Sequence, residues 1–191
     1  THPPSSAASD VYKRQTQQLP IVKKDEDSLT LTNYHWGLVP KWSEKMIDFR
    51  PLNNARLETL MEKRTFSGLI KSQRCLVPAD GYYEWRKNEE GKKFPYFLKR
   101  EHNETLFFAG LYQKNNNLEF SIITTAAKGK ILDIHHRMPV ILKEEEIKNY
   151  LYSKDPMTFL NSHQNPEIVF YEVGRDVNNP SNNHIALLDP A

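Results

Sequence analysis

One carboxylate stands among three aromatic rings in the stretch GYYEW, where Glu84 follows Tyr82 and Tyr83 and precedes Trp85. If this stretch is a strand, Tyr82, Glu84 and Arg86 share one face, and Tyr83 and Trp85 share the other. A carboxylate left among apolar side chains is costly unless it is paired or used in a reaction. Glu84 is therefore a candidate proton-transfer group. Because charged side chains are seldom buried, the commoner interpretation is a Glu that faces solvent or pairs with an arginine.

Two histidines and an arginine occur together in DIHHRMP, residues 133–139, ahead of an apolar segment. Functional side chains concentrate in turns of this kind. One imidazole could act as a general acid or base, and Arg137 could bind a phosphate. His135 and His136 are adjacent, so an extended backbone would point them apart and make them a poor metal pair. Two surface histidines in a polar turn are an equally good interpretation.

A third polar group, NNAR at residues 53–56, precedes apolar residues at near-helical spacing. We expect a helix here, with Asn53 or Asn54 as its N-terminal cap. The free backbone N–H groups of its first turn, with the Asn54 amide and the Arg56 guanidinium, would form an anion site. Helix capping alone is the simpler explanation of the same residues.

The distribution of charge favours an anionic partner only weakly. Residues 41–100 contain fourteen Lys or Arg and eight Asp or Glu, whereas the formal net charge of the whole chain is +2. Trp42 and Trp85 lie within this stretch, and Trp36 lies just before it. Cations and aromatic rings together suit single-stranded nucleic acid, because rings stack on bases and cations follow phosphates. A solvated charged surface explains a surplus of this size equally well.

Several other classes of protein are disfavoured. Cys75 is the only cysteine in the sequence, which excludes an internal disulfide and a cysteine-rich zinc site and fits a reducing, cytoplasmic setting. The sequence contains no Gly-rich phosphate loop, HExxH or GxSxG motif, and we expect no cofactor and no metal. It has no run of eighteen apolar residues and no signal-peptide layout, so we expect no membrane association.

The elements that must position these groups are mostly short strands. Apolar or alternating segments bounded by turn residues predict strands in SLTLTNYHW, RCLVPA, YYEWRK, PYFLKR, LFFAGLY, LEFSIITTA, MPVIL and EIVFYEV. The segment KEEEIKNYL predicts a helix with acidic residues in its first turn. With 191 residues and no internal repeat or linker, the chain is predicted to be a single α+β domain. We expect a mainly antiparallel, curved or barrel-like sheet with a few helices.

Four motifs in this order, WGLVPKW, NARLET, RCLVPADGYYEW and DIHHRMPVIL, resemble the SOS-response-associated peptidase family of abasic site processing proteins. The resemblance runs from about Thr16 to Asn178. It implies a single α+β domain with a basic groove for single-stranded DNA or for a junction of single and double strands. It also implies a hydrolase that cleaves itself to expose an N-terminal cysteine. The amine and thiol of that cysteine then capture the aldehyde of an opened abasic sugar as a thiazolidine, a covalent DNA–protein crosslink.

The resemblance also implies catalytic roles for three residues. Asn54 would orient the reacting groups by hydrogen bonding. Glu84 would act as the general acid and base in self-cleavage and in making or reversing the crosslink. His135 would protonate the ring oxygen of the sugar and promote its opening.

Four further residues are expected to contact DNA on the same basis. Arg56 and Arg137 would bind phosphates beside the lesion. Trp42 and Pro40, from VPKW, would pack against the bases or wedge the strand. The implied partner is single-stranded DNA with an abasic site, bound by a monomeric protein that functions in the DNA damage response.

The opening of the family, Met-Cys-Gly-Arg, does not occur in this sequence, which begins THPPSSAASDVYKRQ. We expect residues 1–15 to be non-native or disordered and residues 16–191 to be an N-terminally truncated domain of the family. A thiazolidine needs an amine and a thiol on adjacent carbons, which Cys75 cannot supply, so this chain should bind DNA more readily than it crosslinks it. Two alternatives stay open: a single-strand-binding remnant without chemistry, and a metal-dependent hydrolase that uses Glu84 and both adjacent histidines.

Overall fold

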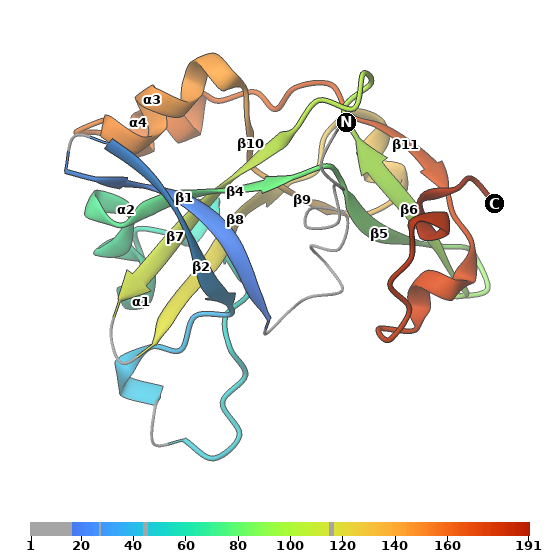
Figure 1. Cartoon of the computed structure of the whole chain (residues 1–191), viewed down its shortest axis with the longest axis horizontal. Helices are drawn as coiled ribbons and strands as arrows, with labels where there is room; N and C mark the ends of the chain where they lie inside the picture. The colour runs from blue at the N-terminus through green and yellow to red at the C-terminus, as the bar shows by residue number, and fades with distance from the viewer. Residues whose placement is uncertain (1–16, 27, 44–45, 115–116) are drawn as a thin grey trace.

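The computed structural model of the chain describes residues 17–26, 28–43, 46–114 and 117–191. A ring of five strands lies at its centre (Figure 1). In ring order these strands are β1 (Gln18–Asp25), β2 (Ser28–Trp36), β8 (Leu118–Ala126), β7 (Leu106–Lys114) and β4 (Arg74–Ala79). Because β4 pairs with β1, the ring is closed, and only its β2–β8 pairing is parallel. The predicted barrel-like, mainly antiparallel sheet is therefore confirmed.

Three short strands extend this ring. β3 (Asn54–Arg56) pairs in parallel with the second half of β8, and β9 (Arg137–Pro139) pairs antiparallel with the end of β8. Thr124 has a partner in both strands, so β8 carries β3 on one side and β9 on the other. β10 (Ile141–Leu142) pairs with β7.

A second, antiparallel sheet has the strand order β11-β6-β5 and lies beside the ring, at the right of Figure 1. Its strands are β5 (Tyr82–Lys87), β6 (Lys93–Lys99) and β11 (Val169–Glu172). Gly81 forms the turn into β5, where a Cβ atom would collide with the Phe97 ring and lie 2.6 Å from the carbonyl oxygen of Leu98. Only glycine therefore allows β5 to pass this close to β6.

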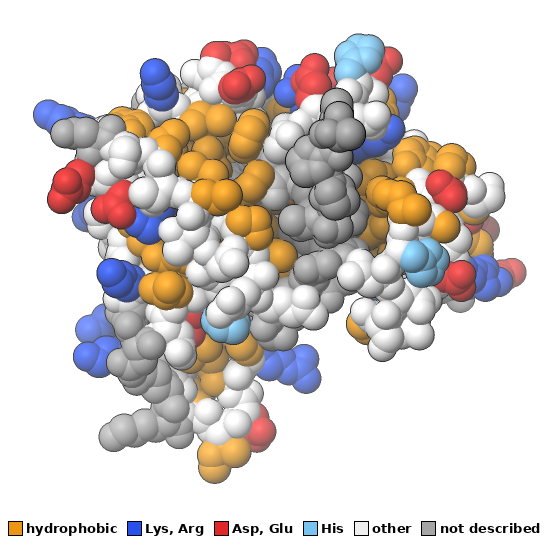
Figure 2. Space-filling model, in the orientation of Figure 1, with side chains coloured by type: hydrophobic (Ala, Val, Ile, Leu, Met, Phe, Trp, Pro, Cys, Tyr) orange, Lys and Arg blue, Asp and Glu red, His pale blue; other side chains and the backbone are white. Residues whose placement is uncertain are grey.

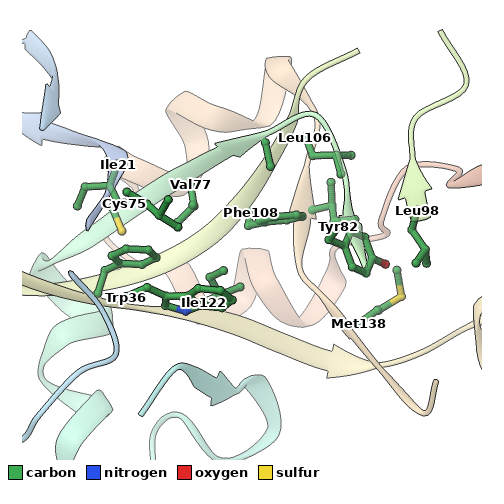
Figure 3. Packing of buried hydrophobic residues seen from close by; sticks show 14 of the residues in the cluster. Ile21, Trp36, Cys75, Val77, Tyr82, Leu98, Leu106, Phe108, Ile122 and Met138 are labelled. Carbon is green, nitrogen blue, oxygen red and sulfur yellow. The ribbon is translucent and has the colours of Figure 1, made fainter. Parts of the chain in front are cut away.

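Inward-facing side chains of all five ring strands form the main core, among them Ile21, Trp36, Cys75, Phe108 and Ile122 (Figure 3). Tyr82 and Leu98 of the second sheet pack into the same cluster. Alternation along each ring strand explains this arrangement, because every second side chain points to the inside of the ring. The ring and the second sheet therefore share one core.

Helices cover the outer faces of the sheets. Four α-helices contribute to a second cluster against β4, β7 and β8: α1 (Arg64–Ser67), α2 (Leu69–Ser72), α3 (Ile147–Tyr152) and α4 (Pro156–Ser162). The 3₁₀ segments are η1 (Lys41–Ser43), η2 (Leu57–Thr59), η3 (Gly129–Asp133), η4 (Glu144–Glu146), η5 (Arg175–Asn178) and η6 (Ile185–Leu188). In the described parts of the chain, no helix is long and apolar enough to cross a membrane.

The predicted strands are confirmed, except that MPVIL is divided between two short strands, β9 and β10, which have different partners. The helix in KEEEIKNYL is confirmed as α3, but its acidic residues form the 3₁₀ segment η4 before it. Strand β1 was not predicted. The helix predicted to begin at Asn53 or Asn54 is wrong, because residues 54–56 form β3 and only the later part of that segment contains the short helices α1 and α2. The backbone of β3 pairs with β8 instead, an interaction between segments far apart in the sequence. The expectation for residues 1–15 falls outside the described residues.

Candidate functional site

β5 presents Glu84 on the face that it shares with Tyr82. Tyr82 packs into the main core, whereas Tyr83 packs against Phe97 in a separate outer cluster, so the two faces alternate as predicted. Glu84 itself is only 8% exposed. The interpretation of Glu84 as a solvent-facing or arginine-paired carboxylate is therefore wrong.

His135 lies against the buried carboxylate. Its Nδ1 atom is 3.7 Å from Oε1 of Glu84, which is an electrostatic contact longer than a hydrogen bond. The turn that follows η3 makes this approach, because the backbone N–H of His135 donates to the carbonyl oxygen of Ile131 at 2.9 Å. Nδ1 also lies 3.2 Å from the backbone nitrogen and 3.1 Å from the carbonyl oxygen of Arg137, so it has a partner whether or not it carries a proton.

The electrostatics of Glu84 suit proton transfer. Burial raises the pKa of the Glu84 carboxyl to about 7, although the neighbouring His135 and a hydrogen bond from the Trp85 backbone both lower it. A carboxyl group with a pKa near neutrality can both accept and donate a proton at neutral pH. The contact between the Glu84 carboxyl and the His135 imidazole, at the edge of the second sheet, is therefore a candidate acid–base pair.

The two adjacent histidines do not point apart as expected. The rings of His135 and His136 lie 4.4 Å apart between centroids with an interplanar angle of 42°. The reason is that these residues follow a turn and precede β9, so the backbone between them is not extended. Within the described ranges, no group of three His, Cys, Asp or Glu side chains is arranged to hold a metal ion.

Asn54 and Arg56 lie on β3 and not at a helix N-terminus, so the predicted backbone anion site is wrong. Both side chains are exposed on one face of β3, and Ala55 between them is buried on the other. Register places Asn54 opposite Ile122 and Arg56 opposite Thr124 of β8. Neither Asn54 nor Arg56 forms a side-chain hydrogen bond or an ion pair with any residue that the structure describes.

Arg137 is held at the junction of β3, β8 and β9. Its guanidinium forms a bidentate pair with Glu58, with distances of 2.8 and 2.9 Å, and donates to the carbonyl oxygen of Thr124 at 2.7 Å. Glu58 also accepts the backbone N–H of Ala126 at 3.2 Å. Both terminal nitrogens of Arg137 donate to groups inside the protein. The phosphate contact expected of Arg137 stays a prediction. Glu58 had no role assigned from the sequence, because it lies in NARLET far from its partner.

These groups form a continuous series along the molecule. Glu84 contacts His135, Arg137 follows His135 by two residues, and Thr124 lies between Arg137 and β3. In the described chain, no hydrogen bond or ion pair joins Asn54 to Glu84 or to His135. The fold thus brings the Glu84 carboxylate and the His135 imidazole into contact, whereas the Asn54 carboxamide lies on β3, which pairs with β8.

Trp42 is the exposed tryptophan of the three. It is 61% exposed on η1, while Trp36 is fully buried and Trp85 donates to Oδ1 of Asn178 at 2.7 Å. Pro40 is buried, so in this conformation it does not offer the surface for bases that was expected of it. Figure 2 shows hydrophobic side chains at the surface over the segment between β2 and β3, at the bottom of the view, in agreement with the exposure of Ile47.

Two buried polar residues missed by the sequence analysis hold the segment that carries Trp42. Glu119 accepts the backbone N–H of Val39 at 2.9 Å, and Gln113 donates to the carbonyl oxygen of Val39 at 2.7 Å. Gln113 also donates to Glu119 at 2.6 Å. Both residues lie on ring strands, so the start of the Trp42 segment is hydrogen-bonded to the barrel on both sides of the Val39 peptide unit.

Comparisons with known proteins give a consistent result. A model of the SOS response associated peptidase (SRAP) family matches residues 5–180. The chain is 36% identical to abasic site processing protein YoqW of Bacillus subtilis (strain 168) over 186 residues, which cover 91% of this chain and 83% of that protein. It is 32% identical to abasic site processing protein YedK of Escherichia coli (strain K12), with 92% and 81% covered. The crystal structure of a protein from Bacteroides thetaiotaomicron is similar with a TM-score of 0.77 and 29% identity, covering 94% of this chain and 83% of that one.

Proposed function

The chain belongs to the SOS response associated peptidase family, and we propose that its site processes abasic sites in single-stranded DNA. The observation that carries the proposal is the contact between the buried Glu84 carboxylate and His135. The residues around this contact support a DNA substrate. Arg137 follows His135 by two residues and bonds to Thr124, and Thr124 is opposite the exposed Arg56. The exposed Arg56 guanidinium, on the strand pair to which Arg137 also bonds, suits a substrate that combines phosphates with a reactive sugar.

The proposed chemistry is capture of the lesion as a covalent adduct. An opened abasic sugar presents an aldehyde, and the amine and thiol of an N-terminal cysteine in the intact family member both bond to its carbon. The aldehyde oxygen leaves as water, which requires protons to be delivered and removed. Glu84 transfers these protons, His135 protonates the ring oxygen of the closed sugar, and Asn54 orients the reacting groups. Self-cleavage that exposes the cysteine would use the same carboxyl group.

The proposed grip on the strand uses charge and stacking. Arg56 has no partner among the described residues and is available to a phosphate. Trp42 offers an exposed ring to an unpaired base, and stacking of that kind favours single strands. As the family resemblance implies, we propose that the protein acts as a monomer, and its single cysteine fits a cytoplasmic setting.

The test compares adduct formation on a single-stranded oligonucleotide with one abasic site, resolved on a denaturing gel. The protein carrying the family's Met-Cys-Gly-Arg opening should form a gel-stable adduct, and its Glu84→Gln variant should do so about 100-fold more slowly. Glu62→Gln is the matched control, because Glu62 is an exposed carboxylate three residues after η2. This substitution should leave the rate unchanged.

Absence of any adduct from the protein with that opening would overturn the proposal. Salt-dependent binding of the strand without an adduct, unaffected by Glu84→Gln, would instead identify a single-strand-binding protein without chemistry.

A further inference from the structure

On the face of the second sheet that carries Glu84, a further group of side chains follows toward the end of the β5–β6 hairpin. Register places Glu84 beside Tyr96 and Tyr96 beside Glu172, across β5, β6 and β11. The next row outward on the same face pairs Arg86 with Phe94. Because side chains two residues apart on a strand share a face and lie about 7 Å apart, this group begins directly beside the acid–base pair.

These outer side chains line a cavity of about 400 Å³, formed by Arg86, Lys87, Asn88, Glu89, Phe94, Tyr96 and Glu172. Arg86 and Lys87 are exposed, and neither has a hydrogen bond or an ion pair to a described residue. Two further cations stand over the Phe94 ring, Lys92 at 5.5 Å and Arg175 at 5.3 Å from its centroid. The carboxylates of Glu89 and Glu172 also line the cavity, which therefore combines aromatic surface with an excess of cations over anions.

The cavity also contains a hydrogen-bond acceptor. Oε2 of Glu172 accepts from the hydroxyl of Tyr96 at 3.3 Å, and this leaves the other carboxylate oxygen available. A carboxylate accepts hydrogen bonds from the exocyclic amino group of a base. Thymine lacks that group, and its one N3–H donor lies between two carbonyl oxygens that a carboxylate repels. Phosphate-binding cations, rings for stacking and an acceptor for a base amino group are together the features that recognise a nucleotide.

We propose that this cavity, the outer subsite, binds a nucleotide that neighbours the lesion and prefers adenine, cytosine or guanine to thymine there. Arg86 binds the phosphate, Phe94 and Tyr96 contact the base, and Glu172 accepts from its amino group. The proposal rests on the proposed function, since the nucleotide belongs to the strand held at Glu84 and His135. It adds a recognition site and a base preference beyond the lesion itself.

Fluorescence anisotropy with the full chain tests this proposal. The probe is a labelled single strand with a central tetrahydrofuran residue, an abasic analogue without an aldehyde, so that only binding is measured. Arg86→Ala should weaken binding about tenfold, in the range of one lost nucleotide contact. Lys93→Ala is the matched control, because Lys93 lies in the same β5–β6 hairpin, is exposed and does not line the cavity. It should weaken binding less than about twofold.

Base preference is measured by placing each of the four bases on either side of the tetrahydrofuran residue. The unchanged protein should bind strands with an amino-bearing base on one side about fivefold more tightly than strands with thymine there, and Glu172→Ala should remove this difference. The effect of Arg86→Ala should also disappear when the strand ends at the lesion on that side. Thermal unfolding of each variant shows that the fold is retained.

Equal weakening by Arg86→Ala and Lys93→Ala, or no base preference on either side, would overturn the outer subsite. Tight binding of the abasic strand by the unchanged protein would in that case leave the proposed function standing. If the unchanged protein does not bind the strand at all, both proposals are wrong.

Discussion

The Glu84 carboxyl is buried where its negative charge has only partial compensation. His135 is the ionisable group in contact with it and lowers its pKa, but burial has the larger effect and raises the pKa to about 7. A raised carboxyl pKa means that the folded protein binds this proton more tightly than the unfolded chain does. The resulting stability is fully present below the unfolded-state pKa and is lost as the pH rises through the folded-state pKa.

Glu84→Gln should therefore change the pH dependence of stability. Near pH 4.5 both side chains are uncharged in the folded protein, and the two proteins should be similarly stable. Above pH 7 the wild-type carboxylate is charged and buried, so the variant should become more stable by roughly 3 kcal/mol. Urea unfolding at pH 4.5 and pH 8.5 measures the difference. Glu101→Gln, at an exposed position, serves as the control, and a pH-independent difference for Glu84→Gln would contradict the burial of a titrating group.

The β3–β8–β9 junction depends on one ion pair between distant segments. Arg137 binds Glu58 in bidentate geometry, and Glu58 also accepts from the end of β8. The hydrogen bond from Arg137 lowers the pKa of Glu58, despite an opposing effect of burial. Stability from this pair is therefore present above the unfolded-state pKa and is lost as the pH falls through the folded-state pKa. The same pair orients the turn that carries His135, because Arg137 follows it by two residues.

A double-mutant cycle measures this connection. Glu58→Ala, Arg137→Ala and the double variant should give a coupling free energy of about 1 kcal/mol at pH 7, because the geometry is bidentate although Glu58 is partly exposed. The coupling should shrink when the pH falls below the titration of Glu58. The i,i+4 pair Arg100–Glu104, which has a single contact in place of the bidentate geometry, is the control, and its coupling should be about 0.3 kcal/mol. Equal couplings for the two pairs would show that the junction does not depend on Glu58.

The segment after β3 shows how local pattern and long-range pairing compete. Leu57, Leu60 and Phe66 have near-helical spacing, but the segment forms only a 3₁₀ turn and the short helices α1 and α2. Ala55 is fully buried and opposite Ile123, so β3 gains both ladder hydrogen bonds and core contacts by pairing with β8. Such gains outweigh helix propensity, which differs by less than about 1 kcal/mol per residue between ordinary residues.

The two sheets should unfold together because they share the main core. Leu98, on β6 of the second sheet, is fully buried in the same cluster as Trp36 of the ring. Leu98→Ala should lower the free energy of unfolding by about 2–5 kcal/mol, and the ring should be destabilised by the same amount. Trp36 fluorescence in a Trp42→Phe/Trp85→Phe background reports on the ring alone. An unchanged midpoint for Trp36, with a lower midpoint by circular dichroism, would show that the sheets unfold independently.

By itself, the sequence determined most of the strands, the alternation of Tyr82, Tyr83 and Glu84, and the ordered motifs that identify the family. These features are local, since side-chain period and turn residues act over a few positions. Roles for Asn54, Glu84 and His135 came from the resemblance, because no spacing rule relates residues so far apart in the chain.

Only the tertiary structure decided which of these residues meet. It brought Glu84 against His135, paired Glu58 with Arg137 across 79 positions, buried Pro40 and made residues 54–56 a strand. The physical reason is the same in each case: contacts between distant segments follow from how the strands close around a common core, and such contacts leave no periodic signal in the sequence.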